Sequence, residues 1–231
     1  METPPSSPKQ RFIFWFCLSL VISGAIVFIP PFFLTCRGCG SSITEATNNA
    51  RQIGTFLTLY AQDHGQLPWK DLPDSPYLPD HFTPQNRSDS NYLLGHLLRA
   101  GYIDSEEIFF AKASKQIRRP DGNISSDATL LAPGECGFTY LSFQDRPFTL
   151  KDNDQLPVLV TPLLPGSHLA DPEPFNKKAV ILRLDSSVHQ KRIEKNGEII
   201  VNKEGHSLFQ IGPGTSWGEQ EPRLHHPLYR D

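Results

Sequence analysis

The four cysteines are the residues of this 231-residue sequence best suited to redox or metal chemistry. Cys36 and Cys39 enclose Arg-Gly, a spacing used for thiol–disulfide exchange when it opens a helix after a βαβ unit. No such unit surrounds them, so we expect a local disulfide or a crosslink between two copies. A tetrahedral zinc site needs four ligands, but Cys17 lies in an apolar run, which leaves Cys136 as the remaining cysteine. We therefore predict structural roles for all four.

Histidines and acidic residues offer a second chemistry, metal binding. His64, His81 and His96 fall on different expected elements, and His225–His226 falls in the C-terminal tail, so no ligand spacing results and we expect solvated side chains. The sequence Asp152–Asp154 could offer oxygen ligands to calcium, but it lacks the spacing of a calcium loop and fits a solvated turn better. We predict no metal site and no cofactor.

Enzyme signatures are absent from the sequence, which contains no Gly-x-Ser-x-Gly, no Walker-type loop and no His-Glu-x-x-His. A net charge of -3 without a basic stripe argues against nucleic acid, whose binding depends on phosphate neutralisation. We therefore expect no catalytic residues, no nucleic-acid partner and no small-molecule substrate. A hydrolase or redox enzyme with dispersed site residues, or a ligand-sensing module, is the alternative.

An uncharged apolar run extends from Phe12 to Leu34 and would span ~34 Å as a helix, enough for the hydrocarbon core of a bilayer. We predict a transmembrane helix over residues 12–34 after a cytoplasmic N-terminus, residues 1–11. Lys9 and Arg11 favour that orientation, so the protein would be single-pass with a periplasmic domain. A cleaved signal peptide also fits a basic start followed by an apolar run.

The remaining sequence predicts an α+β domain over residues 43–209, after a hinge at 35–42 rich in small residues. Apolar residues recur every three or four positions over Ile43–His64, which predicts an amphipathic helix with Leu57 on its apolar stripe and Thr58 on its polar side. A second helical pattern covers Ser90–Gly101. Short strands are expected at Gly137–Phe143, Pro157–Pro162, Ala179–Leu184, Ser187–Glu194 and Glu198–Val201. Residues 210–231 show no period and predict a loose tail.

The motif Asn48-Asn49-Ala50-Arg51-Gln52-Ile53-Gly54, which leads into Leu59–Pro68, resembles the N-terminal part of type II secretion pseudopilins and related bacterial prepilin-like proteins. The segments Ala100–Phe109 and Ala179–Asp185 resemble the same group. The resemblance implies a pilin-like domain, in which an amphipathic helix packs on an antiparallel sheet. It also implies a non-enzymatic role in assembly or secretion, with other envelope or secretion-system proteins as partners.

One family feature is missing. The prepilin-peptidase site of this family is a glycine followed by phenylalanine and then a glutamate, whereas Lys9–Phe16 contains neither the glycine nor the glutamate. The segment from Pro30 to Ser42 also interrupts the single long helix on which filament packing depends. We therefore expect a membrane-anchored relative of the pilins that does not assemble into a pilus.

Overall fold

The computed structural model describes residues 42–69, 88–125 and 129–230. The predicted cytoplasmic segment, the predicted transmembrane helix at 12–34 and nearly all of the hinge lie outside these residues. No helix within the described ranges is long and apolar enough to cross a membrane. The first helix has 23 residues but is amphipathic, with one apolar and one polar face, and the second has only 10 residues. The prediction of a single-pass membrane protein with a periplasmic domain is therefore corrected.

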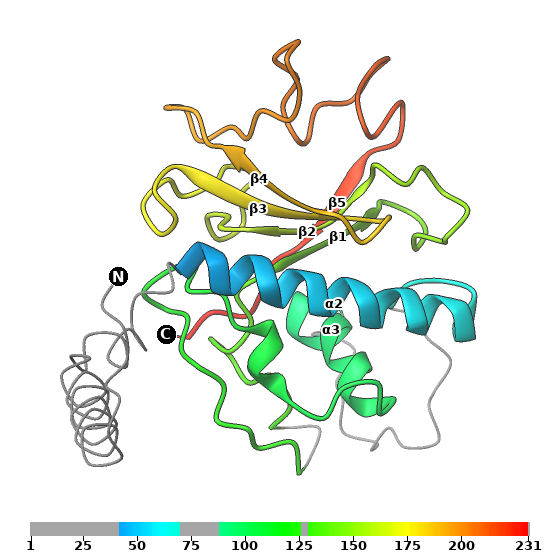
Figure 1. Cartoon of the computed structure of the whole chain (residues 1–231), viewed down its shortest axis with the longest axis vertical. Coiled ribbons are helices and arrows are strands. Elements are labelled where there is room, and N and C mark those ends of the chain that lie inside the picture. Colours follow the sequence, from blue (N-terminus) through cyan, green and yellow to red (C-terminus); the bar gives the residue numbers. More distant parts are fainter. Residues whose placement is uncertain (1–41, 70–87, 126–128, 231) are drawn as a thin grey trace, which may run out of the picture. The chain divides into compact units, whose positions relative to one another are not determined.

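Two α-helices and one 3-10 turn form the helical layer (Figure 1). Helix α2 (Ser42–His64) buries the apolar stripe that the sequence predicts, and it ends where Gly65 adopts a positive φ of 75°. Helix α3 (Ser90–Arg99) begins where the Asp89 carboxylate accepts a hydrogen bond from the Tyr92 amide at 2.8 Å. The short helix η4 (Glu106–Phe109) follows and contacts α2.

Five antiparallel strands form one sheet, in the order β4-β3-β2-β1-β5. The strands are β1 (Thr139–Phe143), β2 (Pro157–Thr161), β3 (Lys178–Arg183), β4 (Val188–Arg192) and β5 (Pro222–His225). Strand β5 corrects the prediction of a loose tail, because four of its residues pair with β1 in continuous register. The expected strand at Glu198–Val201 is reduced to isolated bridges, such as Ile193 with Ile199.

The sheet is covered on both faces. Helices α2 and α3 lie on one side, and the long loops that follow β4 lie on the other (Figure 1). All residues of β1 and β2 are consequently buried, and Leu208 and Trp217 from the loops belong to the same core cluster. The Trp217 indole nitrogen donates to the Leu208 carbonyl at 2.7 Å, which fixes the loop layer.

Contact between α2 and β3 is unusually close at Gly54. A methyl group added there would lie 2.7 Å from Leu182 Cδ1, so the absence of a side chain allows the helix to reach the sheet. Thr58 also takes part in this interface, since its hydroxyl donates to the Gly54 carbonyl at 2.9 Å and lies 2.9 Å from Ser186 Oγ. Thr58, expected on the polar side of the helix, is therefore half-buried and forms polar contacts with the segment after β3.

Candidate functional site

The turn at Asp152, considered as a calcium loop in the sequence, is closed by a guanidinium group. Arg146 donates to both carboxylate oxygens of Asp152, at 2.7 and 3.0 Å, and the Thr149 amide donates to the same carboxylate at 2.7 Å. The hydrogen bond from Arg146 is the main reason why the pKa of Asp152 lies below its usual value. Asp152 therefore has its ligand oxygens already engaged within the turn.

The histidines and cysteines considered in the sequence do not come together in the described residues. His64 stacks on Tyr60 with ring centroids 4.2 Å apart, and the buried His96 lies edge-on to Tyr92 in α3. Cys136 is completely buried, and burial raises the pKa of its thiol to about 12, so it is not a reactive thiolate. Cys17, Cys36, Cys39 and His81 lie outside the described residues.

His225 is the exception, because it forms a pair with a serine hydroxyl. Its Nε2 lies 2.9 Å from Ser142 Oγ, and its Nδ1 lies 2.6 Å from the Ser88 carbonyl, to which it donates. A nucleophile beside an imidazole whose other nitrogen is held by an acceptor is the arrangement of serine hydrolases. The sequence predicted a solvated tail histidine here, and that prediction is wrong, since His225 lies in β5 and is 1% exposed.

Burial decides what the Ser142–His225 pair can do. Ser142 is 0% exposed, so a substrate carbonyl has no route to its hydroxyl in this structure. Around the pair, the Ser90 hydroxyl donates to the His225 carbonyl and accepts from the Tyr140 amide at 2.7 Å. These bonds join α3, β1 and β5. The pair therefore satisfies buried polar groups at the edge of the sheet and holds its last strand.

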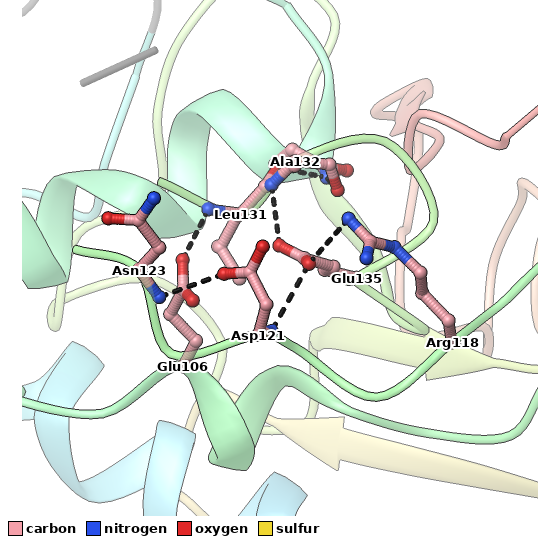
Figure 2. Close-up of polar contacts among 8 residues, drawn as sticks. Glu106, Arg118, Asp121, Asn123, Leu131, Ala132 and Glu135 are labelled. Carbon is pink, nitrogen blue, oxygen red and sulfur yellow. Dashed lines mark hydrogen bonds and ion pairs between the residues drawn. The ribbon is translucent and has the colours of Figure 1, made fainter. Parts of the chain in front are cut away.

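Three carboxylates form the most concentrated group of acidic side chains in the described part of the chain. Glu106 opens η4, Asp121 lies in the turn after it, and Glu135 precedes β1. One oxygen from each side chain lies within 4.8 Å of the other two. Figure 2 shows the three carboxylates beside one another under the backbone of Leu131 and Ala132. We refer to them as the acidic cluster.

Backbone amides position two members of the acidic cluster. Glu106 Oε1 accepts from the Leu131 amide at 2.6 Å, and Glu135 Oε2 accepts from the Ala132 amide at 2.9 Å (Figure 2). Glu135 Oε1 also pairs with Arg118 Nη2 at 2.8 Å. Both glutamates are 0% exposed, whereas Asp121 is exposed and opens the group to solvent. The cluster therefore has two buried carboxylates and one that is in contact with solvent.

The electrostatics of the acidic cluster disfavour full ionisation. Burial is the main cause that raises the pKa of both Glu106 and Glu135, and the nearby charge of Asp121 adds to each increase. The hydrogen bond from the Leu131 amide lowers the pKa of Glu106, and the charge of Arg118 lowers the pKa of Glu135. Neither effect cancels the increase caused by burial. Such a group retains a proton or recruits a cation, and its oxygen-only ligand set suits a hard metal ion.

The acidic cluster was not foreseen from the sequence, which led us to predict no site residues. Its members are separated by fourteen or fifteen positions and match no motif spacing. In the sequence, Glu106 lies in the acidic segment Asp104–Glu107 and Asp121 lies in Pro-Asp-Gly-Asn, and neither segment indicates a shared site. The signal in the sequence is weak: Glu135 stands four residues before β1, next to Cys136.

Comparison of the chain with protein-family models, with curated proteins and with solved structures gives no match. The resemblance to pseudopilins and prepilin-like proteins therefore rests on the sequence segments that carry it.

Proposed function

We propose that this chain is a non-enzymatic, pilin-like interaction module that acts by assembling with other proteins. The observation that carries the proposal is the two-sided character of α2. Its apolar stripe, including Ile53 and Leu57, is buried against the domain, while a second strip of exposed residues runs along the helix from Thr44 to Gln62. The outward strip consists of Thr44, Asn48, Arg51, Thr55, Leu59 and Gln62.

The outward strip of α2 has the composition of a surface for protein contacts. Its residues recur at intervals of three or four, so they share one face of a helix that is ~34 Å long. Arg51 gives it a charge, and Leu59, at 43% exposed, is one of the large apolar side chains left in solvent. A mostly polar strip with one positive charge and one exposed apolar residue suits a reversible protein interface.

The enzyme alternative is less well supported. The arrangement most like a catalytic one, Ser142 with His225, is sealed inside the domain, and the hydrogen bond between the two side chains joins β1 to β5. A fluorophosphonate probe, which labels activated serines, should leave the native protein unmodified. Labelling that disappears in Ser142→Ala would overturn the non-enzymatic proposal.

Photo-crosslinking in the native cell tests the interaction proposal directly. A photoreactive amino acid at Thr55 should give a discrete crosslinked product, whereas the same group at Lys195, in an exposed turn after β4, should give none. Leu59→Asp should weaken the Thr55 crosslink without lowering the melting temperature, because Leu59 is exposed. Equal products from Thr55 and Lys195, or a Thr55 product indifferent to Leu59→Asp, would contradict the proposal.

A further inference from the structure

We propose that the acidic cluster binds one divalent cation, with calcium as the ion its geometry favours, and that the ion fastens the segment around Leu131 to η4. Glu106, Asp121 and Glu135 supply the ligands. The inference rests on these side chains and their surroundings, and it does not depend on the function proposed above.

The first argument is a buried oxygen that lacks a partner. Glu106 is 0% exposed, and while its Oε1 accepts from Leu131, its Oε2 has no hydrogen-bond partner among the described residues. The Gly122 amide is close enough to lower the pKa of Glu106, but it does not form a hydrogen bond of normal geometry with Glu106 Oε2. A buried carboxylate oxygen without a partner is costly, and few native proteins retain one without an ion or a water. Figure 2 shows this carboxylate next to that of Asp121.

The second argument is the local charge. Three carboxylates carry -3, and Arg118, paired with Glu135 at 2.8 Å, contributes +1, which leaves -2 when the group is ionised. The other arginine nearby in sequence, Arg119, is directed elsewhere, to Glu45 and Glu107. One divalent cation therefore neutralises the group, whereas a monovalent cation leaves half of the charge.

The third argument selects the ion. The ligand atoms are all carboxylate oxygens, which suit calcium, magnesium or manganese and not zinc, which prefers nitrogen and sulfur. Calcium–oxygen distances of ~2.3–2.6 Å allow ligand oxygens to lie up to ~4.6–5.2 Å apart, and the three oxygens of the cluster lie within 4.8 Å of one another. Magnesium, at ~2.0–2.1 Å, requires a tighter and more regular shell. Asp121 is exposed, so water can complete the coordination.

The ion would stabilise a part of the fold that is under local strain. Leu131 is buried and has a φ of 45°, a left-handed conformation unfavourable for leucine. Its amide is held by Glu106, and its carbonyl accepts from the Asn91 side chain of α3 at 2.6 Å. By holding Glu106 and Glu135 together, the cation fixes this segment between η4 and α3.

Calcium titration of the full-length chain tests the proposal. After removal of metal with a chelator, calcium at about one hundred times its dissociation constant should raise the melting temperature by about 5–10 °C at neutral pH. Isothermal titration calorimetry should give one site per chain, with magnesium weaker than calcium. No change in melting temperature with calcium, magnesium or manganese would overturn the proposal, since the cluster would then be held by protons alone.

Matched variants locate the site. Glu106→Gln keeps an oxygen for the Leu131 amide but removes a charge, so the metal-free variant should melt at or above the wild-type temperature and should not respond to calcium. Glu107→Gln makes the same change one residue away, on an exposed side chain paired with Arg119, and should respond like wild type. Asp121→Asn should weaken calcium binding at least about tenfold. A Glu106→Gln response equal to that of wild type would place the ion elsewhere and refute the assignment.

Discussion

Replacement of Gly54 by alanine tests how closely α2 approaches the sheet. The new Cβ would lie 2.7 Å from Leu182 Cδ1, whereas unstrained carbon contacts are ~3.5–4.0 Å apart, so the leucine methyl must retreat by about 1 Å. Leu182 is 1% exposed, so its methyl group can move only against packed neighbours or into the small cavity that Gly54 and Leu182 line. Such overpacking costs ~1–3 kcal/mol, and the better helix propensity of alanine returns ~1 kcal/mol. We expect Gly54→Ala to lower the free energy of unfolding by about 1 kcal/mol.

Urea unfolding of the full-length chain, followed by circular dichroism, measures this effect. Gly95→Ala in α3 is the matched control, because its Cβ would meet only the end of the flexible Arg99 side chain, at 3.2 Å, and should leave stability unchanged or increased. Combining Gly54→Ala with Leu182→Val should reveal a favourable coupling energy of ~1–2 kcal/mol between the two positions. A Gly54→Ala variant more stable than wild type, with no coupling to position 182, would refute the close approach of helix and sheet.

Three further predictions concern the core, the start of α3 and the approach to β1. Leu57→Asp places a carboxylate in the interface between α2 and the sheet and should abolish cooperative melting in calorimetry, whereas Thr55→Asp, on the exposed side, should change the melting temperature little. Burial raises the pKa of Asp89 from 3.8 to about 6, so its protonated form favours the folded state. This contribution, about 1–3 kcal/mol, is present below pH ~4 and is lost as pH rises through about 6, and Asp89→Asn should flatten stability across that window in denaturant titrations. Gly137→Ala would place a Cβ 2.0 Å from the Ala111 carbonyl oxygen and should leave the protein unfolded, as shown by rapid cleavage in limited proteolysis.

Local patterns in the sequence predicted the elements whose stability depends on one periodic face. Helix α2 was predictable because its apolar residues repeat at helical spacing. It starts at Ser42, one residue before the expected start. The first four strands lie within or beside the expected apolar runs, and β1, expected from Gly137, begins at Thr139. Both faces of β1 are buried, so its sequence shows no strict alternation of apolar and polar residues, and its two polar residues, Thr139 and Ser142, are buried as well.

Features made by contacts distant in sequence could not be predicted in this way. Strand β5 is short and polar in sequence, and it exists because Leu224 pairs with Leu141 across more than eighty residues. The acidic cluster likewise arises only when η4 and the segment before β1 come together. Nothing in the sequence around Glu106 indicates that its side chain is completely buried.

The order of the strands has a consequence for synthesis on the ribosome. Strand β1 is complete once Phe143 has been translated, but its neighbour β5 starts at Pro222, so one hydrogen-bonding edge of β1 stays open through much of elongation. An open edge of a strand that is buried in the finished fold is prone to pair with other nascent chains, and the sheet can close only after the last strand emerges. A premature stop codon after Gly218 would therefore yield an unfinished and aggregation-prone sheet, although it would remove only a small part of the protein.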